Sequence, residues 1–97
     1  MSYKIILAPE AVEDLHRLRA HLRAIIRDAL EKHLRHEPNK VSKSLIKRPR
    51  GFKRPQYRLR VDNIRVYFYI VEDSVEVLAI VPKSEAQAWL LQQGVRA

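Results

Sequence analysis

The sequence contains no cysteine in its 97 residues. A disulfide scaffold, a zinc ribbon and a thiol nucleophile are therefore excluded. Long hydrophobic runs are also missing, because stretches such as residues 5–8 are far too short for a membrane span or a secretory signal. We therefore expect one soluble, cytoplasmic domain over residues 1–97 that makes no contact with a membrane.

Acidic residues are scarce in the middle of the chain. Residues 40–65 hold ten lysines and arginines but one acid, so this segment carries +9 while the whole chain carries +8. Such a concentration of positive charge is typical of a surface that binds nucleic acid, although a solvated basic loop without a ligand fits the composition equally well. A membrane surface is disfavoured because the segment lacks an amphipathic helical pattern. The loop residues expected to attract phosphates are Lys47, Arg48, Arg50, Lys53 and Arg54.

Histidine is missing from the second half of the sequence. His16, His21, His33 and His36 all lie in the N-terminal part, away from the basic segment. A nuclease that relies on a pair of histidines for proton transfer is therefore disfavoured. His33 and His36 lack an evident third ligand, so we expect neither a metal ion nor another cofactor.

The pattern of apolar residues predicts an α+β fold. Residues 2–7 are typical of a strand, and an amphipathic helical stripe follows from Pro9 to about residue 34. The sequence does not decide between one long helix and two helices joined near residues 19–21. A loop over 38–55 is followed by strands at 56–61, 64–71 and 75–81 and by a helix over 84–91.

The dipeptide Asp-Asn at positions 62–63 predicts a tight turn between two of these strands, because both residue types tolerate positive φ. A two-residue turn pairs Arg60 with Arg65 and Arg58 with Tyr67. Side chains then alternate between the two faces of the hairpin. The face expected to join the core holds Tyr57, Leu59, Val61, Ile64, Val66 and Phe68.

The opposite face of this hairpin, which we expect to meet water, holds Arg58, Arg60, Arg65, Tyr67 and Tyr69. Like charges on facing positions destabilise a sheet, so a bound anion explains the arrangement better than stability does. Guanidinium groups bind phosphate oxygens in pairs, and aromatic rings stack on unpaired bases. In the alternative interpretation the arginines extend into water or pair with Glu10, Glu13 or Glu76.

The same strands resemble the RelE/ParE superfamily of bacterial toxin–antitoxin toxins. The resemblance is carried by residues 57–67 (YRLRVDNIRVY), by residues 75–81 (VEVLAIV), and by Lys83 and Trp89. The N-terminal strand and helical segment also match in order, so the likeness covers nearly the whole chain. It implies a curved antiparallel sheet with two N-terminal helices packed on one face and a short C-terminal helix.

The resemblance also implies site residues. The functional positions of the RelE branch match Arg58, Arg60, Arg65, Lys83 and Trp89. The family more often has arginine at the position of Lys83 and has tyrosine at that of Trp89. Lysine keeps the charge but lacks the guanidinium fork, and an indole has no hydroxyl for acid–base chemistry.

The RelE branch implies an endoribonuclease that cleaves mRNA in the ribosomal A site. The three sheet arginines would hold the scissile phosphate and stabilise its charge, and Lys83 would be the member of the set best suited to proton transfer. Tyr67, Tyr69 and Trp89 would either stack on bases or pack within the protein. A site with so few groups able to transfer protons fits an enzyme whose substrate is oriented by the ribosome.

Two other functions fit the same residues. The ParE branch implies inhibition of DNA gyrase through protein binding, which needs no nuclease residues. A non-catalytic nucleic-acid-binding module is the third possibility. Both toxin functions imply a cognate antitoxin as partner, with an acidic or amphipathic segment, and the RelE branch adds the ribosome and mRNA.

Overall fold

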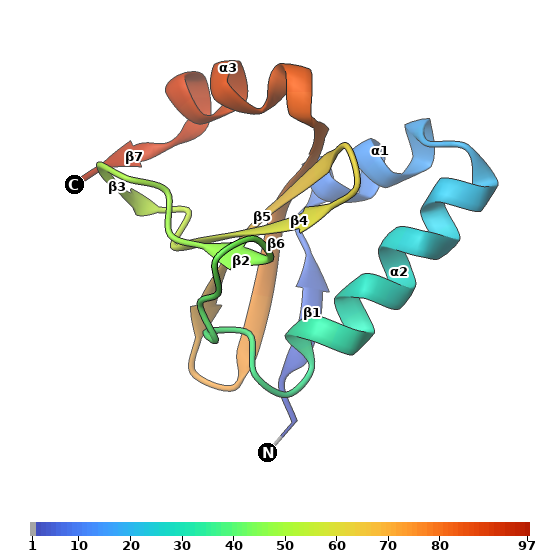
Figure 1. The fold of residues 1–97 in the computed structure, drawn as a ribbon, viewed down its shortest axis with the longest axis horizontal. Helices are drawn as coiled ribbons and strands as arrows, with labels where there is room; N and C mark the ends of the chain where they lie inside the picture. The colour runs from blue at the N-terminus through green and yellow to red at the C-terminus, as the bar shows by residue number, and fades with distance from the viewer. Residues whose placement is uncertain (1) are drawn as a thin grey trace.

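The computed structural model describes residues 2–97 and places helices on both faces of a five-stranded sheet (Figure 1). This arrangement confirms the α+β class. In chain order the elements are β1 (Lys4–Leu7), α1 (Pro9–Arg17), α2 (Ala20–Leu34), β2 (Ile46–Lys47), β3 (Phe52–Arg54), β4 (Tyr57–Val61), β5 (Ile64–Val71), β6 (Ser74–Pro82), α3 (Lys83–Gln93) and β7 (Val95–Arg96).

The main sheet is mixed rather than wholly antiparallel. Its strand order is β1-β6-β5-β4-β2, and β3 pairs with β7 in a separate two-stranded sheet. Strand β1 runs parallel to β6, with Lys4 beside Ser74 and Leu7 beside Val77. The other neighbours in the main sheet are antiparallel. Two helices separate β1 from the next strand of the chain, so β1 cannot join the sheet through a tight hairpin.

The N-terminal helical stripe forms two helices. Leu18 and Arg19 both adopt extended backbone conformations between α1 and α2. Arg23 in the first turn of α2 donates to the carbonyl oxygen of Leu18, which satisfies one of the acceptors left free where α1 ends. Neither these helices nor α3 is long and apolar enough to cross a lipid bilayer, as judged over residues 2–97.

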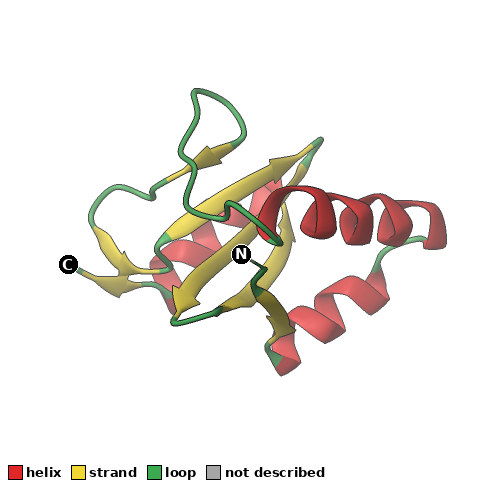
Figure 2. Cartoon of the chain, turned by 90° about the horizontal axis from the view of Figure 1, so that it is seen from below, coloured by secondary structure: helices red, strands yellow, loops and turns green. Residues whose placement is uncertain are grey.

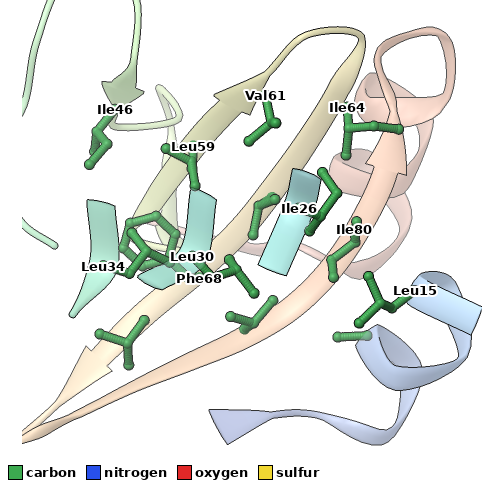
Figure 3. Packing of buried hydrophobic residues seen from close by; sticks show 14 residues of the cluster. Leu15, Ile26, Leu30, Leu34, Ile46, Leu59, Val61, Ile64, Phe68 and Ile80 are labelled. Atoms are coloured by element: carbon green, nitrogen blue, oxygen red, sulfur yellow. The ribbon is translucent and has the colours of Figure 1, made fainter. Parts of the chain in front are cut away.

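The main core lies between these two helices and one face of the sheet. Figure 3 shows Ile26, Leu30 and Leu34 of α2 directed towards the sheet residues Leu59 and Phe68. Helix α1 contributes its own buried side chains to the same cluster. The two helices cover this face of the sheet, and the central sheet residues Leu59, Val66 and Phe68 are fully buried.

The β4–β5 hairpin has the register that the sequence predicts. Arg60 pairs with Arg65 and Arg58 pairs with Tyr67, and Asp62 in the turn has a φ of 51°. Tyr57 packs against the main core from its edge. The other residues expected on the core face are buried there: Leu59, Val61, Ile64, Val66 and Phe68.

The second face of the sheet carries a smaller core of its own. Ala86 and Leu90 of α3 pack on Tyr67 of β5 and Ala79 of β6. Figure 1 shows α3 on the side of the sheet away from α2. The expectation that this face meets water is therefore wrong for Arg65, which is 7% exposed, and for Tyr67, which is 3% exposed.

The C-terminal residues are bonded to the basic connection between α2 and β4, residues 38–55, which is called the basic loop below. Phe52 of β3 pairs with Arg96 of β7, and the Ala97 amide donates to the carbonyl oxygen of Gly51 over 3.0 Å. Figure 2 shows this two-stranded sheet beside the C-terminus. Gly94, which ends α3, lies so close to Phe52 that an added Cβ would be 2.6 Å from the ring. The C-terminal residues thus hold one side of the basic loop in place.

Candidate nucleic-acid interface

A basic pocket opens between the loop before β3, the start of the β4–β5 hairpin and α3. Its volume is about 350 Å³. Every charged residue in the described lining is a cation, so the pocket favours an anionic ligand. The lining, called the basic pocket below, consists of Lys47, Arg48, Pro49, Arg50, Phe52, Arg58, Tyr67, Gln87 and Leu90.

Arg58 is the cation that the sheet itself contributes to the basic pocket. It lies on β4 opposite Tyr67, and its side chain is half-buried. Its Nε is buried without a hydrogen-bond partner in the part of the chain that the structure describes. A buried donor left in this state costs about 1–3 kcal/mol, so the fold tolerates an arrangement that stability alone does not favour.

Arg65 is buried beside Arg58 and Arg60. Its guanidinium donates to the carbonyl oxygens of Asp62 and Ile64 over 2.8 and 3.0 Å, so it braces the hairpin turn. Burial lowers the pKa of Arg65, and the charges of Arg58 and Arg60 lower it further. The guanidinium groups of Arg58 and Arg60 therefore lie close enough to Arg65 to repel its charge.

The protein's own carboxylates do not neutralise these arginines. The ion pairs found within residues 2–97 lie on α1, where Arg17 meets Glu13 and Asp14, and at the end of α2, where Arg35 meets Glu31. The expected alternative, pairing of the sheet arginines with acidic residues, is therefore not what the described part of the structure shows.

Tyr67 of β5 and Trp89 of α3 stack on each other. Their ring centroids are 4.8 Å apart and the planes differ by 11°. Burial raises the pKa of the Tyr67 hydroxyl, while the charges of Arg58 and Arg65 oppose that rise. Of the two roles considered for Trp89, packing within the protein is the one that this contact supports.

The remaining predicted site residues are spread over neighbouring hollows. Tyr69 donates from its hydroxyl to Glu76 over 2.9 Å, and the Arg54 guanidinium lies 4.3 Å from the Tyr69 ring centre. Both residues line a second hollow together with Lys53. Lys83 is exposed at the start of α3, where its amide donates to the carbonyl oxygen of Asn63 over 2.7 Å.

Twelve residues were expected to form the site, and the structure groups five of them in the basic pocket: Lys47, Arg48, Arg50, Arg58 and Tyr67. Arg60 and Arg65 lie beside that group on the same hairpin, with Arg60 exposed. Lys83 lines a different hollow, with Asn63 and Ser84, so the structure does not bring it together with Arg58.

Three lining residues, Phe52, Gln87 and Leu90, are not identified by the sequence patterns. Phe52 is the one aromatic residue within the basic loop, and that position is a usable signal in retrospect. Gln87 and Leu90 are one helical turn apart, which places them on one side of α3. No group of three or more metal-binding side chains is found within the described residues.

Comparison with known proteins places this geometry in a family. A family model described as "ParE toxin of type II toxin-antitoxin system, parDE" matches residues 5–87. No curated protein matches the chain.

Several solved structures share the fold. The RelB–RelE antitoxin–toxin complex of Methanococcus jannaschii contains a chain that is 22% identical, with 87% of this chain and 96% of that chain covered and a TM-score of 0.65. For the RelBE2 complex of Mycobacterium tuberculosis the identity is 23%, the coverage 84% and 92%, and the TM-score 0.66. For the intact Escherichia coli RelBE complex the values are 13%, 84% and 96%, and 0.55.

The family model spans most of the chain, and the superposable structures supply the same fold. The chain therefore belongs to the ParE toxin family, within the RelE/ParE superfamily of toxins from type II toxin–antitoxin systems.

Proposed function

We propose that this toxin is a ribosome-dependent endoribonuclease that cleaves mRNA in the A site. The observation that carries the proposal is the basic pocket, which combines four cations with an aromatic hydroxyl and includes no acidic lining residue in the described chain. Such a pocket accommodates a phosphate together with part of a nucleotide, because cations hold the backbone while aromatic groups contact the base or sugar.

The chemistry assigned to the pocket is mainly electrostatic. Internal attack by the 2′-oxygen places extra negative charge on the phosphate oxygens, and fixed cations lower the energy of that state. Arg58 is fixed by its strand and faces the pocket, so it is the residue we assign to the scissile phosphate. Lys47, Arg48 and Arg50 would hold the flanking backbone. The absence of histidine from the described lining fits a toxin whose substrate is positioned by the ribosome.

Lys83 is not assigned a part in proton transfer, although the sequence suggested one. It is exposed and lines a hollow with Asn63 and Ser84 rather than the basic pocket. Arg60 and Arg65 are assigned to the field around the pocket and, for Arg65, to the shape of the hairpin.

A second function is favoured by one specific finding, the match to a family model named after ParE. That branch implies inhibition of DNA gyrase by protein binding. The two proposals differ in what is damaged first, which is mRNA for the nuclease and DNA for the gyrase inhibitor.

A cognate antitoxin is proposed as partner, because the M. jannaschii and M. tuberculosis structures are themselves antitoxin–toxin complexes. An acidic segment of that antitoxin would fit the charge of the basic pocket. Coexpression of the antitoxin with the toxin is then expected to restore growth.

The deciding experiment is brief induction of the toxin followed by primer extension on a reporter mRNA. We expect cuts at A-site codons while DNA stays intact. Arg58→Ala should slow cutting by about 10²–10³-fold, the usual effect of removing one charge-stabilising donor. Arg27→Ala is the matched control, since it removes the same charge from the exposed surface of α2 and should leave cutting unchanged. Gyrase trapped on broken DNA, with intact mRNA, would contradict the nuclease proposal.

A further inference from the structure

We propose that Tyr67 is the general acid of the cleavage reaction, donating its proton to the 5′-oxygen that leaves the scissile phosphate. This assignment rests on the nuclease function proposed above. It goes beyond that function because it names the group that moves a proton, a task the sequence left to Lys83.

The first argument concerns which side chains lining the basic pocket can donate a proton. Three of its ionisable lining residues are arginines, which hold their protons too tightly to give them up, and Lys47 is exposed on β2. Tyr67 is the one residue in the described lining that carries a hydroxyl. A neutral hydroxyl is suited to donate a proton to an alkoxide as that alkoxide forms.

The second argument is that the Tyr67 ring is held in one orientation. The ring is stacked on Trp89, and its strand is paired with β4 at Arg58 and with β6 at Ala79. Leu90 of α3 belongs to the same small core. A donor fixed in this way needs little reorganisation when the substrate reacts, and this is the condition for efficient proton transfer.

The third argument is the contrast with Tyr69, which lies two residues further along the same strand. The Tyr69 hydroxyl donates to Glu76, so its proton is already engaged. No side-chain hydrogen bond acts on the pKa of Tyr67, in contrast to Tyr69, and the Tyr67 side chain lines the basic pocket. Arg58, directly opposite Tyr67, would bring the phosphate to the side of this hydroxyl.

The protonation state agrees with this role. Burial raises the pKa of Tyr67 and the neighbouring Arg58 and Arg65 oppose the rise, so the phenol stays protonated near neutral pH. No acidic side chain is among the groups that the structure places around it, which are Arg58 and Arg65 on the hairpin and Trp89 on α3.

The reaction balances as an internal transesterification. The 2′-oxygen forms a bond to phosphorus as its own proton passes to solvent water, and the bond from phosphorus to the 5′-oxygen breaks. The Tyr67 proton goes to the departing 5′-oxygen, which leaves a 5′-hydroxyl and a 2′,3′-cyclic phosphate. The phenolate then recovers a proton from water.

The test compares Tyr67→Phe with the wild type in single-turnover cleavage on programmed ribosomes. Two mRNAs are used, one ordinary and one with sulfur in place of the 5′-oxygen at the cleaved bond. A thiolate leaves without needing a proton. We therefore expect Tyr67→Phe to cut the ordinary mRNA about 10²–10⁴-fold more slowly and the sulfur mRNA at the wild-type rate.

Tyr69→Phe is the matched control and should cut both mRNAs as the wild type does. Equal cutting of ordinary mRNA by Tyr67→Phe and the wild type would overturn the assignment of Tyr67 while leaving the nuclease proposal standing. Equal losses on both mRNAs would also overturn it, because they would indicate a role in folding or binding. A wild-type protein that cuts neither mRNA would overturn the nuclease proposal, and the assignment of Tyr67 with it.

Discussion

Replacing Gly94 with alanine is expected to loosen the end of the chain from the basic loop. An added Cβ would lie 2.5 Å from the Leu90 carbonyl oxygen and 2.6 and 2.7 Å from two carbons of the Phe52 ring. Ordinary contacts between such atoms are near 3.5–4.0 Å, so about 1 Å of separation must be gained. Neither neighbour moves freely, because Leu90 O accepts the Gly94 amide over 2.8 Å and Phe52 pairs with Arg96.

The size of the effect follows from these contacts. Overpacking typically costs about 1–3 kcal/mol, and the lower entropy of the unfolded alanine chain returns about 0.4–1 kcal/mol. The expected net loss of unfolding free energy is therefore about 1–2 kcal/mol, which lowers the Tm of a chain this size by about 4–16 °C. Because Phe52 lines the basic pocket, cleavage should slow as well.

Urea unfolding followed through the fluorescence of Trp89, the only tryptophan, measures the loss. A double variant, Gly94→Ala with Phe52→Leu, provides the control, because the smaller side chain removes the ring from the crowded position. The two changes should couple by at least about 0.5 kcal/mol, so that the double variant is more stable than their sum predicts. Strict additivity, or a Gly94→Ala protein as stable as the wild type, would refute the reasoning.

Three further predictions concern the sheet face beneath α3. Arg60→Thr removes a like charge facing Arg65, so urea unfolding should show a gain of roughly 0.2–1 kcal/mol. Trp89→Leu breaks the stack on Tyr67 and should cost about 0.5–1.5 kcal/mol beyond the area lost, again by urea unfolding. The raised pKa of Tyr67 means that the folded chain binds this proton more tightly than the unfolded chain does. Its contribution to stability is therefore complete below about pH 10 and is lost as the pH rises through the folded pKa. Tyr67→Phe should accordingly lose less stability above about pH 10 than the wild type, as measured by thermal unfolding across that range.

The β4–β5 hairpin could be predicted because its signals are local. The turn at Asp62 is encoded by residues that tolerate positive φ, and alternation with a period of two fixes the faces once the turn is placed. Paired residues in a hairpin are close in sequence, so no information from the rest of the chain is needed. The positions of Arg58 and Arg65 follow directly from this register.

The sequence did not predict that α3 covers the sheet face that carries Arg58 and Arg65, because this packing depends on contacts between residues far apart in the chain. One signal was present, because β6 is almost wholly apolar rather than alternating, which is typical of a strand buried on both faces. Ala79, on the face opposite the main core, is the residue that this signal concerns. The pairing of β3 with β7 could not be predicted from the sequence, because strands of two or three residues are too short to show a periodic pattern.

The exposed position of Lys83 could not be read from its place after the last strand. Its amide is bonded to Asn63 at the tip of the hairpin, and its side chain lines a hollow there that does not include Arg58. Sequence spacing fixes where a residue falls along an element, but the direction in which the next element leaves depends on packing.

The parallel pairing of β1 with β6 has a consequence for how the protein is made. Strand β1 ends at residue 7, but the strand with which it pairs begins at residue 74. At ordinary rates of translation, synthesis of the residues between them takes roughly 3–13 s, and β1 has no partner during that time. The basic pocket can form only later in synthesis, because Leu90 lines it and Ala97 is bonded to Gly51 of the basic loop. A nascent chain that has not yet reached these residues therefore carries no finished pocket, and it cannot bind the anion that the pocket is built to hold.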